Sequence, residues 1–380
     1  MIKMTKSTNG SLKAGIIVTL IVLGIMLIIQ TVFALIDSNG RLLLTSRSVA
    51  VDNLGNLYVL SGGRYNIQKL DSQGHFVTRW GTSGNGDGQF NGYSKPNSIV
   101  VDNNNNIYVT DSGNYRIQKF DSQGRFLTKW GTQGNGDGQF GATFNGPCGL
   151  GSDKQNDVYV FDCGNYRIQK FDSQGRFLTK WGTQGNGNGQ FNEPYLSQFG
   201  GITVDKQDNI YVVDGANKRI EKFDYQGRFL LEWGSVGNGL GQFGTPTQVG
   251  PLGLAADNQL NIYVSDGFQI QKFDSNGHFL IQWDVTNVAP WPSESKEYDD
   301  SDSLAIDKQG IIYTVAGVYN DTHDRVEGTD YYNVHLQTFD SDGHFLKRWS
   351  DPFYLPWWFI FSAPLILGLL FSFLYSKLRK

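Results

Sequence analysis

Hydrophobic positions recur along the middle of the chain in a unit of about 50 residues. In each unit an apolar or small residue precedes an Asp, and the six Asp residues are spaced by 50, 51, 52, 52 and 50 positions. Each unit later reaches a Trp, and residues 113–136 are repeated without change at 164–187. This identity indicates recent duplication within a repeat protein. The recurring residues are Asp52, Asp102, Asp153, Asp205, Asp257 and Asp307, and Trp80, Trp130, Trp181, Trp233, Trp283 and Trp349.

The hydrophobic and polar positions within one unit predict four β-strands. In the second unit these strands are residues 98–101, 106–110, 116–120 and 125–130, separated by turn-forming residues. The first two strands are almost wholly apolar, as expected where both faces are buried, whereas the other two mix apolar and polar residues. Six such units with glycine-rich connections predict an all-β fold, a six-bladed β-propeller with four-stranded blades, spanning residues 47–350.

The repeated unit resembles the NHL repeat. The shared motif is V-D-x-x-x-N-[IL]-Y-V-x-D-x-x-N-x-R-I-Q-K-F-D-S-x-G-x-F-[LV]-x-x-W-G, and predicted blades 2, 3 and 4 match it at nearly every position. Blade 1 departs at Ser61, blade 5 is two residues shorter, and blade 6 lacks the Asp-x-x-Asn-x-Arg run. The resemblance implies the propeller fold but no single function, because NHL propellers include ligand-binding ectodomains, RNA-binding domains and lyases.

Residues 37–46 link the first apolar segment to the propeller. They contain Asp-Ser-Asn-Gly-Arg, which resembles the turn between the third and fourth strands of a blade. An extra strand at this position would either complete the last blade or be a remnant of duplication.

Two uncharged apolar segments flank the predicted propeller. Residues 14–36 have no charge over 23 positions, which makes about 34 Å of helix and is enough to cross a hydrocarbon core. Residues 355–375 also lack charges and have Trp357, Trp358 and Tyr375 at their ends, where interfacial aromatic residues are found. We therefore predict two transmembrane helices that contact the lipid bilayer.

Basic residues lie on the outer side of both apolar segments, in the tails formed by residues 1–13 and 376–380. The positive-inside rule places both tails in the cytoplasm and the propeller outside the plasma membrane. A cleaved signal peptide ending near Ala34 is the alternative for the first segment, although its apolar run is longer than the usual ~7–15 residues.

The net charge of −4 divides into two unlike parts. Residues 1–36 and 353–380 hold six Lys or Arg and no Asp or Glu, which leaves 26 basic and 36 acidic residues and a net charge of −10 between them. Nucleic-acid affinity comes mostly from Lys and Arg that neutralise phosphates. We therefore expect no nucleic acid among the partners.

Two recurring patterns resemble catalytic or calcium-binding motifs, but a structural role explains both of them better. A unique catalytic site would not be copied, so we interpret the Asp-x-x-Asn-x-Arg runs as hydrogen-bonded braces. The Gly-Asn-Gly-Asp-Gly-Gln-Phe segments at 84–90 and 134–140 lack full EF-hand spacing and are interpreted as connector turns rather than calcium loops. The braces are Asp111, Asn114 and Arg116; Asp162, Asn165 and Arg167; and Asp214, Asn217 and Arg219.

The histidines argue against most enzymes. His75, His278 and His344 occupy a turn position that holds Arg in the other three units, so we expect them to face solvent. His323 and His335 are unmatched, and two isolated histidines are a thin basis for a zinc site. We name no catalytic residue, and a propeller lyase or hydrolase acting on a peptide or lactone stays as the alternative function.

The only two cysteines fall in the third unit. Cys148 opens its innermost strand and Cys163 follows the neighbouring strand, so the two lie roughly opposite each other in an antiparallel hairpin. Outside the cytoplasm they can form a disulfide, and the alternative is two buried thiols.

The sharpest departure from repetition lies around the sixth unit. The connector at 284–303 and the loop at 316–333 are both expanded, and in propeller topology both loops emerge on one face. Carboxylates mixed with aromatic residues could hold a cation, a basic peptide or a glycan, and solvated loop decoration is the alternative. We predict no cofactor; calcium and zinc are the metals such side chains would take. The candidate ligand-binding residues are Trp291, Glu294, Glu297, Tyr298, Asp299, Asp300, Asp302, Tyr319, Asp321, His323, Asp324 and Asp330, and Asn320 lies in a glycosylation sequon.

Taken together, these patterns predict a membrane-anchored, extracytoplasmic propeller that serves as a binding or sensor module for an extracellular protein, peptide or glycan. A purely structural cell-surface protein is the third hypothesis, beside the binding module and the enzyme.

Overall fold

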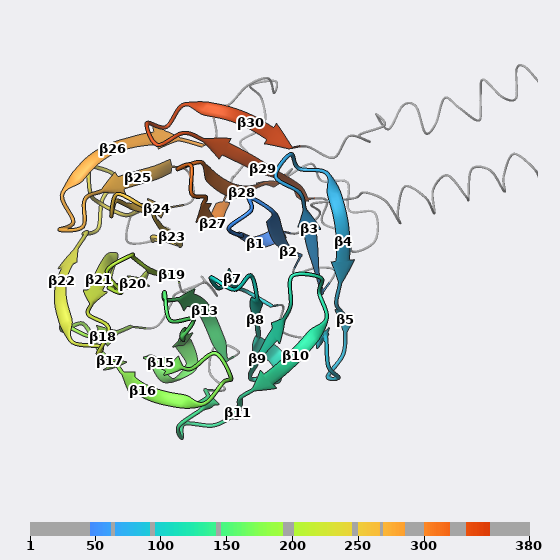
Figure 1. Ribbon diagram of the computed structural model, residues 1–380. Helices are drawn as coiled ribbons and strands as arrows, with labels where there is room; N and C mark the ends of the chain where they lie inside the picture. The colour runs from blue at the N-terminus through green and yellow to red at the C-terminus, as the bar shows by residue number, and fades with distance from the viewer. Residues whose placement is uncertain are drawn as a thin grey trace, which may run out of the picture. The chain divides into compact units, whose positions relative to one another are not determined.

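Six four-stranded antiparallel sheets follow one another along the chain and form a ring (Figure 1). In each sheet the strands are neighbours in chain order, so that the first strand lies innermost and the fourth outermost. The computed structural model describes residues 46–61, 65–91, 96–141, 146–192, 201–244, 250–266, 269–285, 300–319 and 332–349. It confirms the predicted all-β, six-bladed propeller with four-stranded blades.

The blades are numbered in chain order. Blade 1 comprises β1 (Ser46–Val51), β2 (Leu57–Ser61), β3 (Asn66–Leu70) and β4 (Phe76–Trp80); blade 2 comprises β7 (Ile99–Val101), β8 (Ile107–Asp111), β9 (Arg116–Phe120) and β10 (Phe126–Trp130); and blade 3 comprises β13 (Pro147–Ser152), β14 (Val158–Asp162), β15 (Arg167–Phe171) and β16 (Phe177–Trp181).

The second half of the ring repeats this plan. Blade 4 comprises β19 (Ile202–Val204), β20 (Ile210–Asp214), β21 (Arg219–Phe223) and β22 (Phe229–Trp233); blade 5 comprises β23 (Gly253–Ala256), β24 (Ile262–Ser265), β25 (Gln269–Phe273) and β26 (Phe279–Asp284); and blade 6 comprises β27 (Asp300–Ile306), β28 (Ile312–Tyr319), β29 (Tyr332–Phe339) and β30 (Phe345–Trp349).

Short parallel strand pairs shape three of the connectors between blades. They are β5 (Thr82–Ser83) with β6 (Gln89–Phe90), β11 (Thr132–Gln133) with β12 (Gln139–Phe140), and β17 (Thr183–Gln184) with β18 (Gln190–Phe191). The glycine-rich segments 84–90 and 134–140 lie within two of these connectors, as the sequence predicted.

The repeated Asp after each innermost strand closes the turn to the second strand. In blade 2, Asp102 accepts hydrogen bonds from the backbone N–H groups of Asn104 and Asn106 at 2.9 and 2.8 Å. Its second oxygen accepts from the Asn106 amide and the buried Tyr108 hydroxyl, both at 2.9 Å. Burial and the neighbouring Asp102 carboxylate raise the pKa of Tyr108, so the hydroxyl keeps its proton. A buried carboxylate with four donors is satisfied, which explains why the motif is repeated.

The hydrophobic core lies between blades rather than within them. One cluster joins Tyr108, Ile117 and Phe140 from the side of blade 2 to residues of blade 3 such as Val160 and Phe171. The same arrangement recurs from blade to blade, so that neighbouring sheets cover each other's apolar faces. A single blade would leave its apolar faces in water, and the ring is therefore the folding unit.

The four described strands of blade 6, β27–β30, all come from residues 300–349. Figure 1 shows blade 6, in orange and red, beside blade 1, in blue. The closure joins the backbone N–H of Val49 to the Ser303 hydroxyl at 3.2 Å, and the Trp349 indole N–H to the backbone oxygen of Gln73 at 3.2 Å. Residues 37–45, where the sequence predicted an extra strand, lie outside the described residues.

A disulfide joins Cys148 of β13 to Cys163, the first residue of the 3-10 helix η3 (Cys163–Asn165), with the Cα atoms 5.9 Å apart. The corresponding positions in blade 2 are Asn97 and Ser112, whose side chains form a hydrogen bond of 3.4 Å. The covalent bond in blade 3 thus takes the place of a hydrogen bond between the innermost strand and the loop after the second strand.

The two apolar segments predicted to cross a membrane, 14–36 and 355–375, lie outside the described residues. Within the described ranges no helix is long and apolar enough to span a bilayer.

Candidate functional site

Most of the ligand-binding residues predicted around blade 6 lie outside the described residues. Asp300, Asp302 and Tyr319 lie in strands, whereas the sequence pattern placed them in loops. Asp300 and Asp302 lie on β27, and Tyr319 ends β28 opposite Tyr332 of β29. The residues outside the described ranges are Trp291, Glu294, Glu297, Tyr298, Asp299, Asn320, Asp321, His323, Asp324 and Asp330.

The expansions of blade 6 are therefore partly strand, whereas the sequence pattern indicated loops at 284–303 and 316–333. The antiparallel ladder between β28 and β29 continues from Ile312–Phe339 to Tyr319–Tyr332. The β-branched and aromatic residues Val318, Tyr319, Tyr332 and Val334 favour an extended hairpin, although these segments depart from the repeat. No group of three or more His, Cys, Asp or Glu side chains in the described part of the chain is arranged to hold a metal ion.

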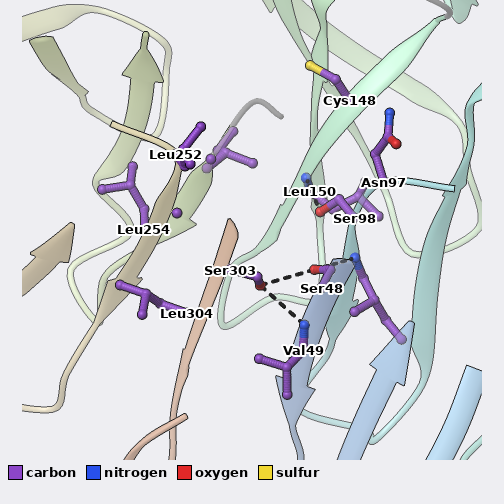
Figure 2. Close-up of a pocket in the computed structure, with 14 residues that line it drawn as sticks. Ser48, Val49, Asn97, Ser98, Cys148, Leu150, Leu252, Leu254, Ser303 and Leu304 are labelled. Atoms are coloured by element: carbon purple, nitrogen blue, oxygen red, sulfur yellow. Dashed lines mark hydrogen bonds between the residues drawn. The ribbon is translucent and has the colours of Figure 1, made fainter. Parts of the chain in front are cut away.

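The innermost strands surround a small axial cavity of about 60 Å³ (Figure 2). Each blade has a small residue followed by an aliphatic residue here, and all of these except Gly149 line the cavity; the six aliphatic side chains are at most 6% exposed. The small residues are Ser48, Ser98, Gly149, Gly201, Gly253 and Ser303, and the aliphatic residues are Val49, Ile99, Leu150, Ile202, Leu254 and Leu304. The six aliphatic side chains fill most of the space around the propeller axis, and the cavity that remains has room for little more than water.

The three axial serines link neighbouring blades. Ser303, Ser48 and Ser98 each accept a hydrogen bond from the backbone N–H of the aliphatic residue in the next blade, at 3.2, 3.4 and 3.1 Å. Figure 2 shows Ser303 within reach of Ser48 and Val49. In the other half of the ring the backbones approach too closely for a side chain, because a Cβ on Gly201 would lie 2.4 Å from the Leu252 oxygen. The three serine hydroxyls therefore join neighbouring blades by hydrogen bonds.

The axial cavity offers little for acid–base chemistry. Besides serine, glycine and aliphatic residues, its lining consists of Asn97 and the disulfide-bonded Cys148. A general acid or base must reach its substrate within hydrogen-bond distance. None of the described lining residues can take that role.

The turn histidines face solvent, as the sequence predicted. The side chains of His75, His278 and His344 are 71%, 76% and 76% exposed, and each ring contacts the Asp four residues earlier. The Asp340 carboxylate raises the pKa of His344. These histidines lie in the turns between third and fourth strands, away from the axial lining.

The Asp-x-x-Asn-x-Arg runs form braces for the connectors, also as predicted. In blade 3, Arg167 donates to the buried Asp162 carboxylate at 2.8 Å and to three backbone oxygens of the connector, those of Asn135, Gly136 and Gln139, at 2.8–2.9 Å. Asn165 donates to Asp162 at 2.8 Å. Burial raises the pKa of Asp162, and the donors from Gly141, Asn165 and Arg167 act in the opposite direction. The brace sets the position of the connector relative to the blade.

A groove with a cavity volume of about 470 Å³ opens beside this brace, where the connector meets blade 3. Two aromatic residues, Tyr166 and Trp181, line it together with amide, hydroxyl and charged side chains. It lies within the ~300–1,000 Å³ range of small-ligand sites. The lining residues are Asn135, Asn165, Tyr166, Arg167, Lys180, Trp181, Gly182, Thr183 and Gln184.

Both basic residues of the groove have a carboxylate partner. Lys180 forms an ion pair with Asp137 of the connector, with 2.6 Å between Nζ and Oδ1. Arg167 is 8% exposed and donates its bonds to Asp162 and to the connector carbonyls. The groove therefore combines aromatic surface and amides with a locally neutral charge.

The backbone of Tyr166 adopts an uncommon conformation. Its φ is +54°, in the left-handed region that favours glycine, and Tyr115 of blade 2 has the same value. This conformation follows the single turn of η3 and directs the chain into β15. A left-handed residue other than glycine costs about 1–2 kcal/mol.

One buried titratable group was not predicted from the sequence. Glu221 of β21 has no exposed surface and stands where other blades have Gln, such as Gln169. Its Oε1 accepts from the backbone N–H of Gly189 at 2.9 Å, as Gln169 accepts from Gly138, while its Oε2 has no hydrogen-bond partner among the described residues. Burial raises the pKa of Glu221 to about 7. The sequence feature that could have revealed this buried carboxyl is a Glu at a repeat position where the other blades have Gln.

Comparison with known proteins supports the predicted repeat. The NHL repeat family matches residues 93–120, and a family described as a 6-bladed beta-propeller matches residues 152–242. The Drosophila melanogaster protein named Protein brain tumor is 28% identical over a region that covers 24% of this chain and 12% of that protein.

Solved structures resemble the whole ring. A streptogramin B lyase is 14% identical with a TM-score of 0.50, covering 82% of this chain and 85% of that chain. A protein of unknown function from Bacteroides thetaiotaomicron is 17% identical with a TM-score of 0.50, covering 72% and 66%. At these identities the likeness concerns the fold alone. The six four-stranded blades make the chain a β-propeller, in which the NHL repeat family matches one segment.

Proposed function

We propose that this propeller is a membrane-anchored binding module that presents its rim to extracellular ligands. The groove of blade 3 carries the proposal, because it combines two aromatic side chains with polar groups beside a braced connector. Ligand sites combine such apolar surface with a few placed polar groups. Binding at a rim groove requires no acid–base chemistry at the axis, which agrees with the Ser, Gly and aliphatic lining found there.

Two independent features support an extracytoplasmic location. The bond between Cys148 and Cys163 is of a kind that persists in oxidising compartments. The apolar segments 14–36 and 355–375, with basic residues on their outer sides, are long enough to cross a bilayer and favour cytoplasmic tails.

A lyase is the alternative from another class, since the fold resembles that of a streptogramin B lyase. A shared propeller does not transfer an activity, because the activity depends on the site. The experiment that separates the functions is a screen of the purified full-length chain against extracellular peptides and glycans, with each bound compound recovered and weighed by mass spectrometry. Recovery at unchanged mass supports a binding module; conversion to product supports a lyase; and the absence of any bound compound supports a purely structural protein.

The location is tested separately on intact cells that express the chain with an epitope at each end. Added protease should digest the propeller and leave both epitopes protected. Digestion of either epitope, or protection of the propeller, would overturn the proposed topology.

A further inference from the structure

Blade 5 keeps only one half of the brace that blades 2, 3 and 4 share. In each of those three blades an Arg donates its Nε proton to a buried Asp and its other protons to three carbonyls of the preceding connector. Blade 5 keeps the carboxylate as Asp266, but Gln269 stands at the position of the Arg. The brace carboxylate of blade 5 therefore lacks the arginine that accompanies it in the other blades.

The other two blades without a complete brace have replaced both members of the pair. Blade 1 has Ser61 opposite Asn66, and blade 6 has Ala316 opposite His335. Neither replacement leaves a carboxylate behind. Blade 5 differs, because a buried carboxylate that has lost its cationic partner destabilises a fold unless another group compensates for the loss.

The surroundings of Asp266 leave the place of the guanidinium open. Asp266 is 8% exposed, and in the described part of the chain its side chain accepts hydrogen bonds from amides only, those of Gln269 at 2.9 Å and Gln271 at 3.4 Å. The Gln269 amide takes the place of the arginine Nε, and nothing in this shorter side chain replaces the rest of a guanidinium. Gln269 is also partly exposed, whereas the three brace arginines are buried, so this position is open to solvent.

The connector before blade 5 is nevertheless held as it is before blade 3. Gln271 accepts from the backbone N–H of Gly241 at 2.9 Å and donates to the backbone oxygen of Gln242 at 2.8 Å, and the equivalent bonds in blade 3 measure 3.0 and 2.7 Å. The φ of Gly241 is +75°, against +74° for its counterpart. The backbone oxygens of Asn238 and Gly239 thus correspond to two that accept from the arginine in blade 3.

A side-chain oxygen in blade 5 also lacks a donor. In blade 4, Glu232 accepts a hydrogen bond from Arg219 Nη1 at 2.6 Å. Gln282 holds the equivalent position in blade 5, since it pairs with Gln271 as Glu232 pairs with Glu221. Its Oε1 atom is buried and has no hydrogen-bond partner among the residues that the structure describes. Buried polar atoms are nearly always hydrogen-bonded, so this oxygen indicates a donor from outside these residues.

We propose that blade 5 binds a guanidinium group from outside the chain, at the place where blades 2, 3 and 4 hold an arginine of their own. The acceptors are the Asp266 carboxylate, the Gln282 side-chain oxygen and the backbone oxygens of Asn238 and Gly239. A guanidinium carries planar N–H donors that reach several such acceptors at once, which an ammonium group does less well. The group comes from an arginine of a partner protein or from a free guanidine. The site does not depend on the groove of blade 3.

The test is calorimetric titration of the full-length chain in a nonionic detergent. Nα-acetyl-arginine amide represents an arginine within a protein, methylguanidinium represents a free guanidine, and Nα-acetyl-lysine amide is the control of equal charge. We expect one arginine amide per chain, bound at least tenfold more tightly than the lysine amide. Tighter binding of the arginine amide than of methylguanidinium would assign the site to a partner protein, and the reverse order would assign it to a free guanidine.

Substitutions in blade 5 locate the site and control for the fold. Gln269→Arg rebuilds the brace of the other blades and should abolish binding, with an unfolding temperature at or above that of the parent chain. Gln259→Arg is the matched control, because it makes the same change at an exposed turn position of the same blade and should leave binding unchanged. Asp266→Asn removes the charge and should weaken binding at least tenfold.

Three results would overturn the proposal: no binding of either guanidine, equal binding of the lysine amide, or binding that survives Gln269→Arg. Displacement of the arginine amide by calcium chloride would also overturn it, because the same oxygens would then belong to a metal site.

Discussion

Trp349, in the last strand of blade 6, packs against Gly74 in the first blade, 275 positions earlier in the chain. Gly74 has a φ of +89°, and a Cβ on it would lie 2.0 Å from the indole nitrogen. The same indole N–H donates to the backbone oxygen of Gln73. The Trp of each other blade meets the equivalent glycine of the following blade, as Trp130 meets Gly175. The contact between Trp349 and Gly74 therefore belongs to the closure between blades 6 and 1.

Gly74→Ala should destabilise the propeller by opening this closure. Gly310→Ala provides the matched control, because Gly310 has a φ of +82° but a Cβ added to it would meet nothing within 4 Å. The control should cost about 1–2 kcal/mol for the left-handed backbone alone. Gly74→Ala should cost about 1–3 kcal/mol more, because the indole must move. Urea unfolding of both variants measures the difference, and equal losses would show that the indole contact adds nothing.

The blades themselves could be predicted from the sequence because their determinants are local. Asp102 satisfies its own turn, and the apolar residues of the second strand that follows are fully buried. Each unit repeats these signals, so an error in one copy is corrected by the other five. The exposed turn position of His75 was predicted by the same comparison between units.

Contacts between blades could not be predicted in this way. A sequence pattern records that Ser48 is small, but not that its hydroxyl meets the backbone N–H of Ile99 in the next blade. The groove beside Tyr166 depends on a connector from blade 2 that folds against blade 3, which is again a contact between repeats. Blade 6 departs from the repeat, so comparison with the other units did not predict the extension of β28 and β29.

Glu221 should make stability depend on pH. Its folded-state pKa of about 7 lies above the unfolded value of about 4.5, so folding takes up a proton between these values. The contribution is favourable below about pH 4.5 and is lost as pH rises through 7. Burial is the largest cause of the raised pKa of Glu221. The backbone N–H of Gly189 and the Arg219 guanidinium, 3.2 Å away, lower this pKa, whereas Asp214 and Glu232 raise it.

Glu221→Gln should therefore restore the amide of the other blades and remove this dependence. We expect no change in the free energy of unfolding near pH 4 and a gain of about 3 kcal/mol at pH 8, from ~1.4 kcal/mol for each pKa unit. Gln169→Glu in blade 3 should introduce a second such group and lower the stability at pH 8. Urea unfolding across this pH range measures both, and parallel stability curves for the parent and Glu221→Gln would refute the assignment.

Arg167→Ala should loosen the connector between blades 2 and 3. The substitution leaves Asp162 buried without its cationic partner, a loss of about 3–5 kcal/mol, and frees the carbonyls of Asn135 and Gly136. Hydrogen exchange in residues 131–140 should quicken, since their anchor is gone. Arg176→Ala is the control, because this arginine is 79% exposed and its surface ion pair contributes little. Unchanged exchange in Arg167→Ala would show that the connector is held by other contacts.

The disulfide of blade 3 should stabilise the ring by restricting the unfolded chain. Its ends are 15 positions apart, for which loop closure predicts about 3 kcal/mol. Cys148→Ala with Cys163→Ala should lose this contribution, and reduction should lower the unfolding temperature of the parent chain but not of that variant. Cys148→Asn with Cys163→Ser installs the hydrogen-bonded pair of blade 2 and should recover part of the loss. An unfolding temperature that reduction leaves unchanged in the parent chain would mean that the bond carries no stability.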